Sequence, residues 1–355
     1  MFLRGRHLRL VMVLITGLCS AVVIFLFIQA NINISKSHED IRRIPVHPPE
    51  GASGGRVPLQ SQPIRTGHPS NDDFMQRQAA IQMQRLHQLQ AGCKMALGDA
   101  DVNRTIRRRA LSHFIVDDKY RLVYCHVPKV ASTSWIRVFL VLKGIMDDTS
   151  IGNQTFIQRG AMSRLRLLHT YDGQDTQYIL ANYTKFLFVR NPFSRLLSAF
   201  KNKLAVNPEN DGRIPWYAWI RYVKEYINKS TAGDKDQGEN YNISFSDFVK
   251  FVGDPKTKSS NQHWNPILHR CFPCHINYTF IGKIESLQTD VDYLFKLAEI
   301  EKLVTFPSNE GSSPTNSTNE MALYYQDIPK LDINNIYRKF KRDFNFFGYD
   351  NLHDS

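Results

Sequence analysis

The sequence predicts an α/β fold in which a parallel sheet is flanked by helices. Within residues 105–355, short apolar segments of strand length alternate with longer segments of helical composition. A chain of 355 residues with 42% hydrophobic and 12% aromatic content can bury a sizeable core. Strands that alternate with helices are typical of a parallel sheet whose connections cover its two faces.

The N-terminus predicts a membrane anchor in front of this domain. Three arginines within residues 1–9 precede an uncharged apolar run from Leu10 to Ile28. About twenty such residues cross the hydrocarbon core of a bilayer, and the flanking arginines favour the cytoplasmic side. We therefore expect a cytoplasmic tail (1–9), a transmembrane signal anchor (10–30) and a lumenal remainder. A long cleaved signal peptide is the alternative, and it also leaves the remainder lumenal.

Residues 31–104 are predicted to form a lumenal stem or linker. Residues 31–70 are rich in Pro, Gly, Ser and His, a composition that buries too little apolar surface to order itself. Residues 71–96 contain helix-forming residues and are expected to form a short amphipathic or self-associating helix. A homodimer through this stem is a possible consequence, and the globular domain is placed at residues 105–355.

The first half of the globular domain contains two strand–helix pairs. The first strand ends at Pro128 and the first helix at Gly144, two residues that interrupt regular structure. Pro192 is suited to the first position of the second helix. The predicted elements are a strand at 120–127, a helix at 132–142, a strand at 185–189 and a helix at 192–204.

The second half is predicted to be mainly helical, with one further strand. Residues 216–228 are aromatic-rich and helical in composition. Ser244 and Asp247 have the spacing of a capping box that begins the next helix. Residues 278–284 are strand-like. Two more helices are expected at residues 288–299 and 333–342.

The first strand–helix junction, VPKVASTSW at residues 127–135, has the features of an anion site. A helix N-terminus presents unpaired backbone N–H groups and the positive end of the helix dipole, which together attract phosphate. Lys129 adds a charge, and Ser132, Thr133 and Ser134 add hydroxyl donors. The glycine pattern of a Walker loop is absent. An ordinary helix cap with a solvated Lys129 is the alternative interpretation.

The second junction, FVRNPFSRLLSAF at residues 188–200, repeats this arrangement. Asn191 is a good N-cap and Pro192 a good first helical residue. Arg190 stands where the strand becomes a helix and can donate two hydrogen bonds to a phosphate; Ser198 follows two turns later. Taken alone, Arg190 could be a structural ion-pair residue and Ser198 a packed polar one. Together, the two junctions are suited to the two phosphates of a 3′,5′-bisphosphonucleotide.

These two loops resemble the 5′-phosphosulfate and 3′-phosphate loops of the Golgi carbohydrate sulfotransferases. The chondroitin and dermatan 4-O-sulfotransferases and the glucuronyl 3-O-sulfotransferase form the most similar subgroup. The similarity continues through SFSDFVKFVGDP, QHWNPILHRCFPCHINYTFIGKIESL and RKFKRDFNFFGYD, and covers about residues 105–350. It implies a P-loop-like core that binds phosphoadenosine phosphosulfate (PAPS) as co-substrate.

The resemblance also implies which residues bind PAPS. The 5′-phosphosulfate end would be bound by Pro128, Lys129, Val130, Ala131, Ser132, Thr133 and Ser134. The 3′-phosphate would be bound by Arg190, Asn191, Pro192, Phe193, Ser194, Arg195, Leu196, Leu197 and Ser198. Asn191 departs from the family pattern, in which an acidic residue commonly stands at this position, and this affects how Arg190 is held.

The expected mechanism is an in-line sulfuryl transfer without a covalent enzyme intermediate. Lys129 would stabilise the charge that develops on the leaving bisphosphonucleotide. A histidine would accept the proton of the sugar hydroxyl, and His263 is the first choice. His169 is the alternative base, and His126 is as well explained by a packing role. This mechanism requires no metal.

The formal charge of +12 favours an acidic partner. The expected acceptor is an acidic glycan, with position 4 of N-acetylgalactosamine in chondroitin or dermatan preferred. Glucuronyl 3-O-sulfation and a non-catalytic Golgi glycan-binding protein are the alternatives. The predicted anchor argues against nucleic acid as the partner and implies a single-pass type II Golgi membrane protein with a lumenal catalytic domain.

Cysteines and sequons agree with an oxidising lumen. Cys93, Cys125, Cys271 and Cys274 lie outside the predicted span, and disulfides or buried thiols are favoured over a metal site, with the pairing left open. Eight N-x-[ST] triplets are glycosylation candidates. They begin at Asn33, Asn103, Asn153, Asn182, Asn228, Asn242, Asn277 and Asn316.

Overall fold

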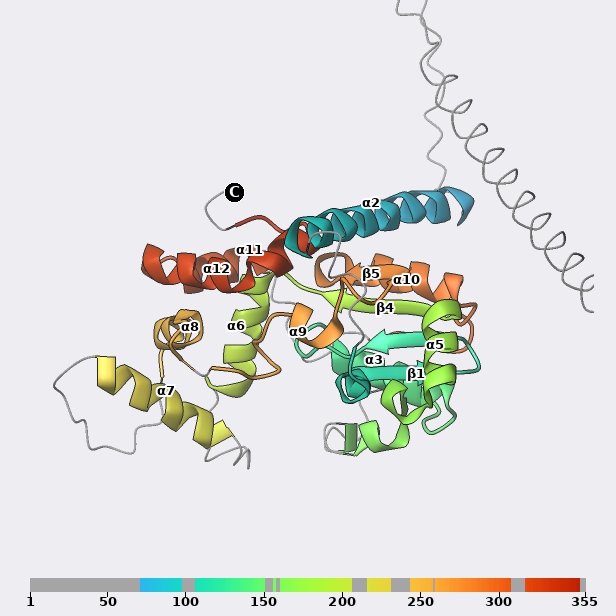
Figure 1. The fold of residues 1–355 in the computed structure, drawn as a ribbon, viewed down its shortest axis with the longest axis horizontal. Coiled ribbons are helices and arrows are strands. Elements are labelled where there is room, and N and C mark those ends of the chain that lie inside the picture. Colours follow the sequence, from blue (N-terminus) through green and yellow to red (C-terminus); the bar gives the residue numbers. More distant parts are fainter. Residues whose placement is uncertain are drawn as a thin grey trace, which may run out of the picture. The chain divides into compact units, whose positions relative to one another are not determined.

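A five-stranded mixed sheet forms the centre of the structure, a computed structural model (Figure 1). The model describes residues 71–97, 106–150, 156–157, 160–205, 216–230, 243–257, 259–307 and 317–351. All of these belong to one unit, Gly67–Ser355. The strand order is β3-β1-β2-β4-β5. The strands are β1 (Phe114–Asp117), β2 (Leu122–Cys125), β3 (Arg166–Leu167), β4 (Thr184–Val189) and β5 (Phe280–Lys283).

The prediction of a parallel sheet is right for only part of this sheet. Strands β2, β4 and β5 are parallel neighbours, whereas β1 pairs antiparallel with both β2 and β3. The turn from β1 to β2 is short: Asp117 accepts a hydrogen bond from the Tyr120 N–H at 2.8 Å, and Arg121 has a φ of 52°. Such a short connection joins only antiparallel strands, whereas parallel strands need a crossover.

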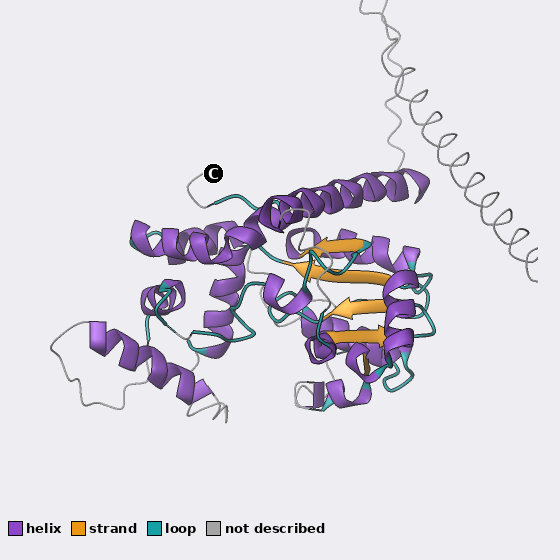
Figure 2. Ribbon diagram, in the orientation of Figure 1, coloured by secondary structure: helices purple, strands orange, loops and turns teal. Residues whose placement is uncertain are grey.

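Helices surround the sheet and continue beyond it into a second helical layer (Figure 2). Helix α3 ends at Leu142, as predicted, and Gly144 follows with a φ of 69°. The helices are α2 (Asn71–Leu97), α3 (Ser132–Leu142), α5 (Gly173–Asn182), α6 (Pro192–Lys203), α7 (Tyr217–Ser230), α8 (Phe245–Gly253), α9 (Leu268–Cys271), α10 (Leu287–Leu297), α11 (Ser317–Tyr325) and α12 (Lys330–Phe347). Short 3₁₀ helices include η1 (Arg108–His113), η2 (Ala161–Arg164), η3 (Leu168–Thr170) and η6 (Ile284–Ser286).

Two hydrophobic clusters hold these layers together. In the first, Trp135 of α3 packs on Tyr124 and Phe186 of the sheet, with ring centroids 5.6 and 4.9 Å apart. In the second, α6, α8, α11 and α12 pack around Phe193 and Phe248, which are fully buried. The first strand–helix junction leads into α3 of the first cluster, and the second junction leads into α6 of the second cluster.

Helix α2, predicted as part of a stem, packs on β5, α10 and α12 within the folded unit. Arg85 pairs with the buried Asp290 at 2.8 Å, and the side-chain Oε1 of Gln82 accepts the Ile281 N–H at 2.9 Å. A disulfide joins Cys93 to Cys274. Residues 71–97 are therefore part of the globular structure rather than a tether. The face of α2 that packs does so against β5, α10 and α12 of the same chain.

The predicted transmembrane run at residues 10–30 lies outside the described residues. Among the helices that the structure does describe, none is long and apolar enough to cross a membrane. The rest of the proposed stem, residues 31–70 and 98–104, also lies outside the described part of the chain. The anchor and its orientation therefore remain predictions.

All four cysteines of the described residues form disulfides. Cys125 pairs with Cys271, and Cys93 with Cys274, so the two cysteines of the CFPC segment have different partners. Of the sequon asparagines, Asn182, Asn228 and Asn277 are exposed in the structure. The other five lie outside the described residues.

Candidate active site

The first phosphate loop connects β2 to α3 through an unusual backbone. Lys129 and Ala131 have positive φ values of 73° and 58°. A left-handed conformation at non-glycine residues costs about 1 kcal/mol or more each and is typical of functional loops. The buried Val130 between them anchors the loop in the core.

This backbone turns the chain abruptly into the N-terminus of α3. The first intrahelical hydrogen bond runs from the Trp135 N–H to the Ala131 carbonyl at 3.2 Å. The N–H groups of Ser132, Thr133 and Ser134 therefore precede the ladder, as in the first turn of any helix. With Lys129 next to it in the chain, this helix N-terminus has the features that favour an anion.

The second loop connects β4 to α6 and confirms the predicted cap. The Asn191 side-chain oxygen accepts hydrogen bonds from the N–H groups of Phe193 and Ser194, at 2.9 and 3.4 Å, and Pro192 takes the first helical position. Arg190 is only 8% exposed and donates from Nε to Ser194 Oγ at 2.8 Å. This bond orients the guanidinium at the N-terminus of α6.

A carboxylate from another element stands near Arg190. Glu285 accepts the Asn191 N–H at 2.9 Å and the Tyr349 hydroxyl at 2.9 Å through its two carboxylate oxygens. Burial lowers the pKa of the Arg190 guanidinium, and the charge of Glu285 opposes that shift. Glu285 thus supplies a negative charge close to Arg190, although residue 191 itself is uncharged.

The other residues predicted to bind PAPS divide into two groups. The side chains of Val130, Phe193, Leu196 and Leu197 are buried in the hydrophobic clusters. They fix the loops, and only their backbones could contact a cofactor. Ser198 is half-buried on α6, one turn after Ser194 and on the same face.

Arg195 has a role that the sequence did not indicate. Its buried guanidinium donates to the carbonyl oxygens of Pro128 at 3.2 Å, Asn265 at 2.7 Å and Gln262 at 3.2 Å. It therefore joins the first phosphate loop, the second phosphate loop and the segment that carries His263. Burial is the main cause that lowers the pKa of Arg195, to about 10.

His263 lies among the positive charges of both loops. Its ring is edge-on to Trp216, with centroids 5.0 Å apart, and Lys203 lies 4.8 Å from the centroid of that indole. Burial lowers the pKa of His263 to about 3, with further lowering by Lys203 and Lys129. The imidazole is therefore neutral near pH 7.

Asn261 fixes the tautomer of this imidazole. The backbone N–H of His263 can only donate, so the Asn261 atom that accepts it at 2.9 Å is the amide oxygen. The same oxygen lies 2.9 Å from Nδ1 of the ring. Nδ1 therefore carries the proton, and the lone pair of Nε2 is left to accept one.

The two alternative histidines have different surroundings. His126 accepts hydrogen bonds from Arg270, at 2.6 Å on its carbonyl oxygen and 3.3 Å at Nδ1. Burial, followed by the charge of Arg270, lowers the pKa of His126 to about 3. His169 lies on η3, which packs beside η1 and β1, and its carbonyl accepts a hydrogen bond from Arg108. Of the three histidines, His263 is the one whose pKa is lowered by the charge of Lys129.

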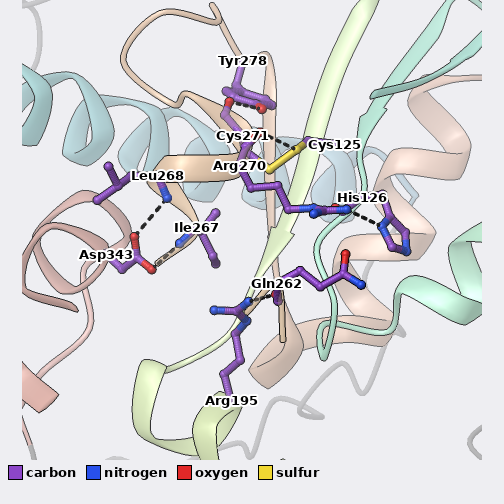
Figure 3. The surroundings of a disulfide bond; sticks show 10 residues. All are labelled: Cys125, His126, Arg195, Gln262, Ile267, Leu268, Arg270, Cys271, Tyr278 and Asp343. Atoms are coloured by element: carbon purple, nitrogen blue, oxygen red, sulfur yellow. Dashed lines mark hydrogen bonds between the residues drawn. A yellow bond between two sulfur atoms is a disulfide. The ribbon is translucent and has the colours of Figure 1, made fainter. Parts of the chain in front are cut away.

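Several residues of this site escaped the sequence analysis. Asn261 and Glu285 act through contacts with the loops, and only the two-residue spacing of Asn261 and His263 could have signalled an Asx-type turn. Arg270 is brought beside His126 by the Cys125–Cys271 disulfide (Figure 3). Within the described residues, no group of His, Cys, Asp and Glu side chains could hold a metal ion.

Comparison with known proteins identifies the family. The sulfotransferase family model matches residues 112–350. The chain is 32% identical to carbohydrate sulfotransferase 10 of Xenopus laevis over 264 residues, 69% of this chain and 71% of that protein. It is 30% identical to carbohydrate sulfotransferase 11 of Rattus norvegicus over 353 residues, 95% and 93% of the two chains.

A third relative, carbohydrate sulfotransferase 14 of Mus musculus, is 28% identical over 310 residues, 87% of this chain and 79% of that protein. No solved structure matches significantly. PAPS is the general sulfate donor of the family, and both phosphate loops lie within the matched residues. The chain therefore belongs to the sulfotransferase family and groups with its carbohydrate sulfotransferases.

Proposed function

We propose that the protein transfers a sulfuryl group from PAPS to a hydroxyl of an acidic glycan in the Golgi lumen. The preferred acceptor is the 4-hydroxyl of N-acetylgalactosamine in chondroitin or dermatan. The observation that carries the proposal is the link made by Arg195, which joins two phosphate-type loops to the segment of a neutral histidine.

The residues present fit a 3′,5′-bisphosphonucleotide. The left-handed Ala131 directs the N-terminus of α3 toward one anion, with Lys129 beside it. Arg190, held by Ser194, marks a second anion site at the N-terminus of α6. Bound PAPS supplies the activated sulfuryl group and its bisphosphonucleotide leaving group.

Two side chains carry the proposed chemistry. Lys129 stabilises the negative charge that develops at the first loop. A positioned cation in such a site lowers the activation free energy by about 3 kcal/mol. His263 accepts the acceptor hydroxyl proton at Nε2, because Asn261 holds Nδ1 in the protonated form. An anion at the first loop offsets the field of Lys129 and so raises the basicity of His263.

The test is transfer of label from sulfur-35 PAPS by the detergent-solubilised full chain. The acceptors are desulfated chondroitin, desulfated dermatan and an oligosaccharide that ends in glucuronate. We expect label on a desulfated polymer and a loss of about 100-fold or more in Lys129→Ala. Arg190→Ala should raise KM for PAPS at least about tenfold.

Arg338→Ala, which removes an exposed charge on α12, is the matched control and should transfer normally. Label only on the glucuronate oligosaccharide would move the acceptor to the 3-hydroxyl of glucuronate. Folded protein that neither transfers label nor binds 3′,5′-ADP would refute the proposal.

A separate prediction concerns the base. His263→Ala should lower kcat by about 10²- to 10⁴-fold while KM for PAPS changes little, because the imidazole acts on the acceptor proton. Steady-state kinetics with both substrates varied measure this split. His169→Ala is the control and should keep kcat; the reverse pattern would assign the base to His169.

A further inference from the structure

A cavity of about 190 Å³ lies beside the proposed base. Its walls come from His113 at the end of η1, Val127 at the start of the first loop, Arg195 and the segment between Ser260 and Arg270. Asn261 and Gln262 belong to this wall and flank His263 in sequence. A group bound in the cavity is therefore close to the segment that carries His263.

Arg195 and Arg270 both line this cavity. Their side chains come from different elements, α6 and α9 (Figure 3). The hydrogen-bond partners of Arg195 are three backbone carbonyls. Those of Arg270 are the carbonyl and Nδ1 of His126, at 2.6 and 3.3 Å. All of these partners are neutral, and no ion pair among the described residues includes either arginine.

The carboxylate that acts on Arg195 is that of Asp343, and its oxygens are already engaged. They accept the N–H groups of Ile267 at 2.7 Å and Leu268 at 3.3 Å. Burial raises the pKa of Asp343 to about 6, so its carboxylate is largely ionised at neutral pH and offsets part of the charge of Arg195. Arg270, which is partly buried, has no carboxylate partner among the described residues, so its positive charge at the cavity is not compensated by an anion.

The lining favours a small anion with several oxygen atoms. The remaining N–H groups of Arg270 are charge-assisted donors. Gln262, exposed at the wall, and Asn265 add amide groups. A planar carboxylate on a sugar ring matches this donor set, because a guanidinium can bind a carboxylate through two parallel hydrogen bonds.

We propose that this cavity binds the carboxylate of a hexuronate residue in the acceptor glycan, with Arg270 as the main contact. The proposal rests on the proposed function and assigns it an acceptor subsite. The subsite would select uronate-bearing chains and position the neighbouring N-acetylgalactosamine, whose hydroxyl faces His263.

The test measures binding rather than turnover. A desulfated chondroitin hexasaccharide with glucuronate at its non-reducing end is titrated into the full chain saturated with 3′,5′-ADP. The same hexasaccharide with its carboxyl groups reduced to alcohols is the neutral ligand. We expect the neutral ligand to bind at least about tenfold more weakly, because charged hydrogen bonds are lost.

Three variants locate the effect in the cavity. Arg270→Gln should weaken binding of the acidic hexasaccharide about tenfold or more. Gln262→Glu keeps every backbone contact of residue 262 and should weaken it about three- to tenfold by like-charge repulsion. Gln262→Lys should bind at least as tightly as the parent. None of these changes should alter binding of the neutral ligand, and Arg338→Gln controls for net charge.

The outcomes separate this inference from the proposed function. Equal affinity for the acidic and neutral ligands, or no effect of Gln262→Glu in a folded protein, would overturn the subsite. A parallel loss of 3′,5′-ADP binding in Arg270→Gln and Gln262→Glu would assign the cavity to the donor and also overturn it. Failure of the parent protein to bind 3′,5′-ADP at all would instead refute the proposed function.

Discussion

Arg195 shows how a single residue connects the parts of this site. Its three carbonyl partners belong to residues that lie 67 to 70 positions away in the sequence. A guanidinium is suited to this role because its donors are fixed in a planar fork. The residue therefore positions the loops rather than reacting itself.

We predict that Arg195→Lys separates the loops while keeping the charge. A lysine ammonium is a compact point charge and cannot span three carbonyls in this arrangement. KM for PAPS should rise about tenfold and kcat should fall by a similar factor. The measurement is steady-state kinetics together with 3′,5′-ADP binding, with Arg338→Lys as control. Parent-like kinetics would show that the three contacts are not needed.

Asp343 gives a second prediction at this scale. Burial raises its pKa from 3.8 to about 6 in the folded state, so the folded protein binds the proton more readily than the unfolded chain. Its contribution to stability is then full below pH 4 and is lost as pH rises through 6. The expected loss is about 3 kcal/mol, since each pKa unit corresponds to about 1.4 kcal/mol.

Asp343→Asn does not titrate, so it removes this pH dependence. The unfolding free energy of the parent minus that of the variant should fall as pH rises from 4 to 6. Urea denaturation at several pH values measures it. A difference that stays constant or grows over this range would contradict the assignment.

At the scale of elements, the sequence predicted those whose signals are local. The apolar runs of β2, β4 and β5 and the caps of α6 and α8 are visible within a few residues. Strand β3 has only two residues, too short for a periodic pattern. Strand β1, which has four residues like β2 and β5, was not predicted. Helix α9 has only four residues and depends on contacts with Asp343.

The Cys125–Cys271 disulfide ties the end of β2 to α9 across 146 residues of sequence. Both cysteines are fully buried. Replacing both by Ala should lower the free energy of unfolding by about 3 kcal/mol, because the unfolded chain gains entropy. Guanidinium chloride denaturation measures this loss.

The same variant should weaken binding in the cavity, because Arg270 is adjacent to Cys271 in sequence. Its affinity for the acidic hexasaccharide should fall while 3′,5′-ADP still binds. An unchanged unfolding free energy and an unchanged affinity would both argue against a role of this disulfide in holding α9.

At the scale of the whole molecule, helix α2 belongs to the folded unit through its own disulfide and a buried ion pair. We predict that a fragment starting at residue 106 has a Tm at least about 10 °C below that of a fragment starting at residue 67. It should also expose one new titratable thiol, that of Cys274. Thermal unfolding and thiol titration check both, and equal Tm values would show that α2 is dispensable.

The sequence by itself determined the local features of this protein. The α/β class, the two strand–loop–helix junctions, the helix caps and the family resemblance all depend on residues close together in the chain. Backbone geometry converts such patterns directly into elements. The candidate phosphate sites followed from them, because a helix N-terminus binds anions wherever it occurs.

Only the tertiary structure decided how these parts meet. The disulfide partners, the antiparallel β1, the packing of α2, the carbonyl contacts of Arg195 and the cavity at Arg270 join residues up to 181 positions apart. No local pattern encodes such a contact, because the entropy cost of closing a long loop is offset only by the packing of the complete core.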